Sequence, residues 1–504
     1  MKIRYYILLI LLSLLVKSCN KNETIKPNVI FIIVDDLGYK DLGVYGSSFY
    51  ETPNIDKLIN DGVMFTNGYS NSSVCSPARA SFQTGKYPVK TGITDWIKGR
   101  KHHKGATPND RWIVPETAFE LDLDETTIAE ALKIKGYKTA YVGKWHLGED
   151  EKYWPENQGY DINVAGWRAG SPNKQKNNNG YFSPYGNPKL TDGPIGEYLP
   201  DRLTDEALSI LKNKADQPVF LCLSYYLVHA PFQAKQESID FFKEKRQREA
   251  LESNEEFLNS QPWMEVATGN PKRYKERIIQ GHPTYAAMVH SLDENVGRLI
   301  SSLKENKSYE NSLIVFVSDN GGLSTSEGSP TSNLPLAKGK GWMYEGGLRV
   351  PFSIKPPFSN ENFKTDMPVS GIDIFPTILA YAGENAINKQ LDGINLAPYI
   401  RKHTKADERP IFWHYPHYSN QGGNPSSAVR LGDFKLIHDL ETNKSELYNL
   451  NIDMEESTNL INDKPNISKK LKNILNNWLN ENYNMTFNEN PTWNGKQAID
   501  QTKK

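Results

Sequence analysis

The segment Cys75-Ser76-Pro77-Ala78-Arg79, followed by Thr84-Gly85, has the residue types and spacing best suited to chemistry in this sequence. Because proline favours the first turn of a helix, a helix is expected to begin beside Cys75. Backbone N–H groups and the helix dipole favour negative charge at such a position. The pattern predicts a reactive residue at Cys75, for which a thiolate of lowered pKa is one form. The alternative is a half-buried cysteine in front of an ordinary helix.

Four buried strands are predicted, and they alternate with helices. Continuous apolar, β-branched runs are typical of strands covered on both faces, and they occupy residues 28–34, 139–142, 219–224 and 313–318. Segments with helical periodicity lie between them, at 126–135 and 203–212. The alternation predicts an α/β fold with a mostly parallel sheet and helices on both faces. In such sheets, ligands bind beyond the carboxyl ends of the strands.

Polar residues follow each of these strands and include a set of oxygen donors. Asp35-Asp36 follow the first strand and Asp319-Asn320 the fourth. These donors suit a hard cation, Ca²⁺ before Mg²⁺, rather than zinc. Either pair alone is equally typical of a turn after a strand. Two pairs at equivalent strand ends, close to the cysteine motif, favour a metal site.

Bulk composition excludes one class of partner. A chain of 504 residues is expected to form two domains. The formal net charge of −1 argues against general nucleic-acid binding, because there is no basic excess to neutralise phosphates. An anionic substrate would have to be bound by a local cluster of basic residues.

Residues 1–19 are expected to be a targeting segment. Lys2 and Arg4 precede an apolar run at 5–16 that is short for a membrane span. A small residue before Cys19 resembles a lipoprotein signal with Cys19 lipidated, whereas Lys17 fits poorly and leaves ordinary signal-peptide cleavage open. Either route predicts export, to the periplasm, to the bacterial cell surface as a lipoprotein, or by secretion. Membrane contact would occur only through the lipid anchor.

The three cysteines, at positions 19, 75 and 222, are too few for a disulfide scaffold. Cys222 lies in a predicted strand and is expected to be an inert core thiol. A disulfide between Cys75 and Cys222 is the alternative.

Beyond the predicted sheet, two segments are expected to leave the core: a long surface loop at 167–200 and a partly helical insertion at 239–275. A change of pattern near residue 385 predicts a smaller C-terminal domain. Its expected elements are strands at 411–415, 428–431 and 435–438 and an amphipathic helix at 467–481. The tail from 483 to 504 is polar and expected to be poorly ordered.

In combination these motifs resemble the formylglycine-dependent (type I) sulfatases of the alkaline-phosphatase superfamily. The resemblance covers roughly residues 26–481 and is carried by the motif around Cys75, by Gly143-Lys144-Trp145-His146 and by Lys338-Gly339-Lys340-Gly341. It implies an alkaline-phosphatase-like catalytic core at 26–385. It also implies a C-terminal subdomain at 386–482 with an antiparallel sheet and a helix.

The resemblance implies that a maturation enzyme oxidises Cys75 to formylglycine, which would join the metal ligands around one Ca²⁺. Those ligands are Asp35, Asp36, Asp319 and Asn320. One hydroxyl of the aldehyde hydrate would attack sulfur and expel the alcohol, and loss of a proton from the second would release sulfate.

The same resemblance assigns roles to five further residues. Arg79 and Lys144 would hold the hydrate, His146 would be the base on its second hydroxyl, and His229 and Lys340 would contact the sulfate and its leaving oxygen. Because Ala337 and Lys338 depart from the residues common in relatives, the assignment of Lys340 rests on its Gly-Lys-Gly context.

The substrate is expected to be a sulfated polysaccharide or oligosaccharide. Candidate sugar-binding residues are Arg100 and His102 in the basic run at 98–104, Trp167, Arg168, His414 and His417. Two alternatives remain: a phosphodiesterase or phosphonate hydrolase of the same superfold, and a non-catalytic surface lipoprotein that binds glycans.

Overall fold

The computed structural model describes residues 26–99, 106, 108, 110–172, 179–213, 217–251, 256–258, 275–383, 391–483 and 487–495. The expected targeting segment with Cys19, and the basic residues Arg100 and His102, lie outside the described residues. Among the described residues, no helix combines the length and the apolar character needed to cross a membrane.

An eight-stranded sheet forms the centre of the molecule, with the order β12-β2-β11-β10-β1-β7-β5-β6. In chain order its strands are β1 (Asn28–Val34), β2 (Val63–Phe65), β5 (Lys138–Gly143), β6 (Ile162–Val164), β7 (Val219–Ser224), β10 (Ser312–Ser318), β11 (Phe352–Lys355) and β12 (Phe363–Thr365). β11 runs antiparallel to both of its neighbours, and the other pairs are parallel. The predicted α/β class with a mostly parallel mixed sheet is confirmed.

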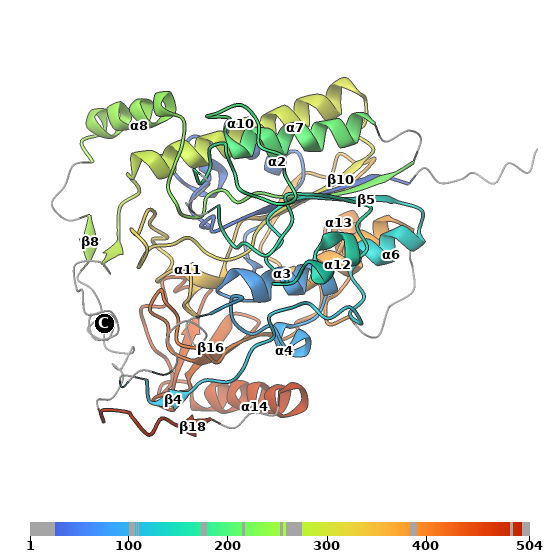
Figure 1. The fold of residues 1–504 in the computed structure, drawn as a ribbon. Helices are drawn as coiled ribbons and strands as arrows, with labels where there is room; N and C mark the ends of the chain where they lie inside the picture. The colour runs from blue at the N-terminus through green and yellow to red at the C-terminus, as the bar shows by residue number, and fades with distance from the viewer. Residues whose placement is uncertain are drawn as a thin grey trace, which may run out of the picture.

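Helices cover both faces of this sheet, as Figure 1 shows. One face carries α2 (Pro53–Asn60), α7 (Leu199–Lys212), α8 (Gln236–Arg248) and α10 (Pro283–Glu305), and the other α3 (Cys75–Thr84), α6 (Ile128–Ile134), α12 (Ile374–Tyr381) and α13 (Ala397–Lys402). Side chains of β1 alternate between the two layers: Ile30 packs with the α10 side and Phe31 with the α3 side. Burial on both faces explains why the strand is apolar at every position after Asn28.

The C-terminal part forms a second, antiparallel sheet. Its strands are β14 (Ile411–Tyr415), β15 (Ser426–Leu431), β16 (Phe434–Asp439) and β17 (Lys444–Asn449), in that spatial order. Helix α14 (Pro465–Asn482) covers one face, where Trp478 stacks on Phe412 at a ring separation of 4.5 Å. This arrangement is the predicted antiparallel sheet with a helix.

Shorter elements connect these layers. They are η1 (Gly43–Tyr45), β3 (Gly68–Tyr69), α4 (Pro88–Thr91), β4 (Trp112–Ile113), η2 (Glu151–Tyr153), η3 (Pro155–Asn157), β8 (Phe257–Leu258), β9 (Glu276–Arg277), α11 (Glu345–Leu348), β13 (Val369–Ser370), η5 (Gly371–Asp373) and β18 (Asn488–Glu489).

Two expectations about the periphery are corrected. The segment at 167–200 is largely irregular, but it is not only a surface loop, because Tyr181, Tyr185 and Tyr198 are buried in the core beside β7 and α7. The tail is not uniformly disordered: β18 pairs with β4, far away in the sequence. Apolar side chains within polar segments account for the first difference.

A buried ionic cluster joins the C-terminal sheet to α11. Lys435 of β16 lies 2.9 Å from Glu345 of α11 and 2.9 Å from Glu456, and all three side chains are fully buried. Glu345 also accepts a hydrogen bond from Tyr69 at 2.7 Å. Because α11 closely follows the loop that contains Lys340, this cluster anchors the C-terminal end of that loop.

Replacing Lys435 by Met is expected to lower the free energy of unfolding by about 3–5 kcal/mol, because two buried carboxylates would lose their shared cation. Urea unfolding at pH 8 measures the change, and Lys470→Met, on the exposed side of α14, serves as the control. A loss of less than about 1 kcal/mol, the range of exposed ion pairs, would contradict this account of the cluster.

Candidate active site

Four parallel strands end level at one edge of the central sheet. Val34, at the end of β1, is in register with Ser318, at the end of β10. Gly143, at the end of β5, is in register with Ser224 of β7. Because the ends are level, the residues that follow them meet in one cluster, as the sequence predicted.

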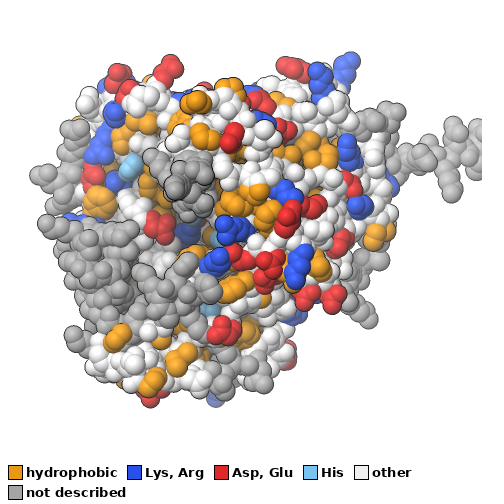
Figure 2. Space-filling model, in the orientation of Figure 1, with side chains coloured by type: hydrophobic (Ala, Val, Ile, Leu, Met, Phe, Trp, Pro, Cys, Tyr) orange, Lys and Arg blue, Asp and Glu red, His pale blue; other side chains and the backbone are white. Residues whose placement is uncertain are grey.

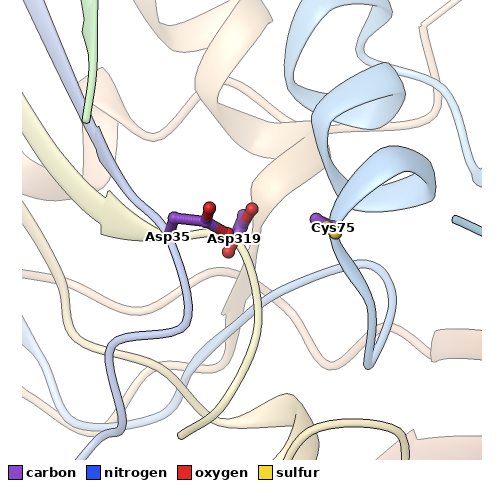
Figure 3. Close-up of side chains that lie close together, drawn as sticks. All are labelled: Asp35, Cys75 and Asp319. Carbon is purple, nitrogen blue, oxygen red and sulfur yellow. The ribbon is translucent and has the colours of Figure 1, made fainter. Parts of the chain in front are cut away.

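The acidic residues and the cysteine face one another across this edge. In Figure 3, Asp35 and Asp319 project from the neighbouring ends of β1 and β10, and Cys75 lies opposite them at the start of α3. One oxygen of each carboxylate and the Cys75 sulfur all lie within 4.8 Å of one another. The three side chains are buried.

Three buried cations balance three buried carboxylates in the cluster. The shortest contacts are Lys144 Nζ to Asp35 Oδ2 at 2.7 Å, Arg79 Nε to Asp319 Oδ2 at 2.7 Å and Lys340 Nζ to Asp36 Oδ1 at 2.7 Å. Burial alone would raise the pKa of Asp36, but the charge of Lys340 above all holds it below its usual value. The protein groups alone are therefore close to electrically neutral.

The oxygen donors of the cluster fit a hard cation. Asp35 Oδ1 and Asn320 Oδ1 are buried and have no hydrogen-bond partner among the described residues, although buried polar oxygens are nearly always bonded. The Asn320 amide is oriented because its Nδ2 donates to Asp36 Oδ1 at 2.8 Å, which leaves Oδ1 as an unused acceptor. Oxygen-only donor sets of this kind suit Ca²⁺ or Mg²⁺.

The pKa of Asp35 also indicates that the cluster suits a cation. Burial raises this pKa well above the usual range, and the charges of Asp319 and Asp36 add to the rise against the attraction of Lys144. More positive charge than the protein supplies is needed to keep this carboxyl ionised, and a bound divalent cation would supply it.

Cys75 is the first residue of α3, as its motif predicted, but its thiol is not activated. Burial raises the pKa of Cys75, because loss of water outweighs the nearby charges of Lys144 and Lys340. This direction does not favour a thiolate of lowered pKa, which was one of the forms that the motif allowed for Cys75. Cys75 and Cys222 are both free thiols, and burial raises the pKa of Cys222 to about 12, as suits an inert core residue.

His229 presents one ring nitrogen to the cluster. Its Nδ1 lies 2.7 Å from the carbonyl oxygen of Ala230, which can only accept, so Nδ1 carries the proton in the neutral ring. Nε2 faces Asp36 Oδ2 at 3.7 Å. Burial lowers the pKa of His229 to about 4, with Lys340 adding to the effect. The ring is neutral until an anion binds beside it, whose charge favours the protonated form.

His146 is held between a serine and a glycine. Its Nδ1 lies 3.2 Å from Ser76 Oγ, which also accepts the backbone N–H of Ile97 at 3.0 Å. Its backbone is left-handed, with a φ of 57° that a non-glycine residue rarely adopts. Burial, with the charges of Lys144 and Arg79, keeps the pKa of His146 well below its usual value. A neutral imidazole is able to accept a proton.

Comparison with known proteins identifies the family. A family profile described as "Sulfatase" matches residues 27–384. A second, described as "N-sulphoglucosamine sulphohydrolase, C-terminal", matches residues 338–482. The chain belongs to the sulfatase family. It is accordingly a sulfuric ester hydrolase, and its fold is the alkaline-phosphatase-like fold of that family.

Similar proteins cover nearly the whole of this sulfatase. A "Sulfatase" of Formosa agariphila is 30% identical over 95% of this chain and 94% of that protein. The N-acetylgalactosamine-6-sulfatase of Sus scrofa is 30% identical over 85% of this chain and 74% of that protein. The crystal structure of Ps i-CgsB in complex with k-i-k-neocarrahexaose has 27% identity and a TM-score of 0.69, covering 90% of this chain and 92% of that one.

A pocket of about 470 Å³ leads from the surface of the sulfatase to this cluster. Four of the predicted catalytic residues line it: Cys75, His146, His229 and Lys340. Arg79 and Lys144 lie beneath the pocket, fully buried. Of the predicted sugar-binding residues, Trp167 and Arg168 line the wall.

The two histidines expected to close over the site lie elsewhere. His414 is buried, with Nδ1 2.7 Å from Ser427 Oγ and its ring packed on Tyr483. His417 is buried against Thr94, at 2.9 Å. Neither lines the pocket, so for these two the expectation is wrong. Both histidines are packed inside the protein, His414 in β14 and His417 in the loop that follows it.

Sequence reasoning missed several pocket residues. These are Glu149, Ser171, Glu327, Asn420 and Gln421. Asn420 and Gln421 belong to the loop between β14 and β15, so the C-terminal subdomain does reach the pocket, through residues other than those expected. No spacing signal marks single polar residues in loops, and only the fold brings them together.

Gly170 packs against the face of His146. A Cβ on Gly170 would lie 2.5 Å from Cε1 and 2.7 Å from Nε2 of the ring, closer than real contacts allow. Gly170→Ala is therefore expected to displace the imidazole and lower kcat about tenfold or more, because small misplacements of catalytic groups are costly.

The matched control is Gly281→Ala, since a Cβ there meets atoms only at 3.8 Å or beyond. Steady-state kinetics and a melting curve of both variants separate activity from stability. An unchanged kcat in Gly170→Ala would show that catalysis does not depend on the exact position of the His146 ring.

Proposed function

We propose that this sulfatase hydrolyses sulfate esters of a sulfated polysaccharide or oligosaccharide, through formylglycine made from Cys75 and one Ca²⁺. The observation that carries the proposal is the position of Cys75 at the start of α3, facing buried oxygen donors, at the base of a pocket that also exposes His146, His229 and Lys340. The pocket is far larger than a sulfate group and leaves room for a sugar. The names of two relatives, a sugar sulfatase and a protein bound to a neocarrahexaose, support a glycan substrate.

Two groups would complete the site. Formylglycine, as its hydrate, would supply a hydroxyl nucleophile and a second hydroxyl from which a proton is removed. Ca²⁺, held by Asp35, Asp36, Asp319 and Asn320, would supply the positive charge that the sulfate requires. With the protein charges close to balance, a divalent cation makes the site electropositive.

The protein's own residues would orient the nucleophile, bind the sulfate and transfer protons. Arg79 and Lys144, buried beneath residue 75, fix the orientation of the groups attached there. Lys340 lies at the pocket wall, where it would bind a sulfate oxygen. His146 accepts a proton, for which its neutral form is suited. His229, protonated once the anion is bound, donates through Nε2 to the leaving oxygen.

Sulfate release from a panel of sulfated glycans tests the proposal, using protein co-expressed with a formylglycine-generating enzyme. Ion chromatography should detect sulfate from at least one glycan, with lower turnover of matched phosphate diesters and phosphonates. Faster phosphorus–oxygen cleavage would favour the phosphodiesterase or phosphonate hydrolase. Glycan binding by fully converted protein without any release would favour a non-catalytic role.

A further inference from the structure

The pocket wall carries charged side chains of both signs above the catalytic cluster. On the described part of the face in Figure 2, Lys and Arg side chains are interspersed with Asp and Glu, so the field of the whole face does not select one sign of charge. Any preference for a second charged group on the substrate must come from individual residues of the wall.

One part of the wall has two cations and one carboxylate. Lys98 Nζ lies 2.5 Å from Glu149 Oε2, and Arg168 Nη1 lies 3.9 Å from the same oxygen. Lys98 and Arg168 are each partly exposed, at 36% and 47% of their side chains. Since one carboxylate compensates two cations, this part of the wall keeps a positive excess and is able to accept an anionic group of the substrate.

Another part of the wall has a carboxylate and no cation paired with it. Glu327 lines the pocket and forms no ion pair with the described Lys and Arg residues; its Oε1 accepts a hydrogen bond from Gln421 Nε2 at 2.8 Å. Asn420, beside it on the pocket wall, is also uncharged. This part of the wall is therefore acidic and rich in hydrogen-bonding groups.

Gln421 is itself held firmly. Its carbonyl oxygen accepts hydrogen bonds from Thr325 Oγ1 at 2.7 Å and from Trp342 Nε1 at 3.0 Å. Its side-chain Oε1 accepts a bond from Ser419 Oγ at 2.7 Å, which leaves Nε2 to donate to Glu327. The carboxylate of Glu327 is thus oriented by a loop of the C-terminal subdomain.

Glu327 acts electrostatically on the residues that would bind the sulfate. It lines the same pocket as His229 and Lys340. A carboxylate on the pocket wall repels a further anion that is placed on its side of the pocket. It also accepts hydrogen bonds from hydroxyl groups, the commonest donors on a sugar ring.

We propose that Glu327, oriented by Gln421, is a specificity-determining residue that binds free hydroxyl groups of the sugar carrying the scissile sulfate and excludes a second sulfate or carboxylate from that side. A further anionic group of the substrate is accepted only toward Lys98 and Arg168. The substrate class is a sugar with one sulfate in the pocket and unsubstituted hydroxyls beside it. This inference rests on the proposed sulfatase reaction.

The test compares kcat/KM for a monosulfated and a disulfated form of the same sugar. The probes are N-acetylgalactosamine 6-sulfate with its 4,6-disulfate and galactose 6-sulfate with its 2,6-disulfate, or the same design on the sugar that the glycan panel identifies. Wild-type enzyme is expected to prefer the monosulfated form by about tenfold or more, since like charges brought together in a binding site cost several kcal/mol.

Glu327→Gln keeps the shape and removes the charge. It should weaken or abolish the preference by raising kcat/KM for the disulfated sugar and lowering it for the monosulfated one, which loses charge-assisted hydrogen bonds. Glu237→Gln, an exposed residue in the first turn of α8 and outside the pocket, makes the same change of net charge and should leave the ratio unaltered.

The outcomes separate this inference from the proposed function. A ratio of kcat/KM values that is unchanged in Glu327→Gln for both pairs of sugars would overturn the role of Glu327 while sulfate release continued. An enzyme with converted Cys75 that releases sulfate from no ester would overturn the proposed function instead.

Discussion

Cys75→Ala is expected to lower kcat/KM for sulfate release by about 10³-fold or more, because alanine offers no atom that can become or replace the nucleophile. The fold should survive. Cys75 makes its contacts through one small side chain at the start of α3, and the helix is also fixed by Arg79, whose guanidinium bonds to Asp319, Ser224 and the Lys144 carbonyl. Kinetics on the panel substrate and a thermal melt measure the two properties.

Cys222→Ala is the matched control, since it removes the other described cysteine from the core strand β7. This variant should lose some stability through the small cavity it leaves and keep its turnover. Retained turnover in Cys75→Ala would refute the assignment of the nucleophile. Equal loss of turnover in both variants would point to a general effect on folding.

Removal of Ca²⁺ by a chelator is expected to reduce sulfate release by about 10²-fold or more, a loss comparable to that of other groups stabilising transition-state charge. Without the ion, Asp35, Asp36 and Asp319 are matched by Arg79, Lys144 and Lys340, so the site has little excess positive charge to bind an anion. Added Ca²⁺ should restore the activity, and Zn²⁺ should not, because the donors are oxygens.

A binding readout makes this prediction independent of turnover. Since the ion binds only the folded protein, Ca²⁺ at a hundred times its Kd should add about 2.7 kcal/mol to the free energy of unfolding. Asn320→Leu, which removes the unused acceptor Oδ1, should reduce this gain. A melting temperature that does not respond to Ca²⁺ or to the chelator would contradict the metal site.

The position of the catalytic cluster can be predicted from the sequence, because several of its residues follow long, fully buried strands. The runs 29–34 and 313–317 are apolar throughout, and parallel pairing makes the ends of their strands level. The positions of Asp35, Asp319 and the motif of Cys75 could therefore be predicted together. Local sequence was sufficient for Asp35, Asp319 and Cys75 because each lies at or directly beside the end of a strand or helix.

Other parts of the fold depend on tertiary contacts that no local pattern contains. Strands β2, β6 and β12 have three residues each, too few for a recognisable period. The long helix α10 begins at Pro283 with His282 as its N-cap, and its sequence gave no expectation of a helix. Glu327 and Gln421 meet across 94 residues, so their hydrogen bond could be found only in the folded chain.

The pKa of Cys75 shows how burial changes an expectation from sequence. The helix N-terminus predicts a thiolate, but loss of water raises the thiol pKa instead. Burial therefore reverses the direction of the pKa shift that the helix N-terminus alone would produce at Cys75.

Mass analysis of the peptide containing Cys75, paired with sulfate release from the same preparation, tests the central claim most directly. Preparations with graded conversion are obtained by varying the level of a co-expressed formylglycine-generating enzyme. The account predicts that kcat per protein molecule rises in proportion to the fraction of residue 75 found as formylglycine and falls to background when all of it is cysteine. Turnover that is independent of this fraction would contradict it.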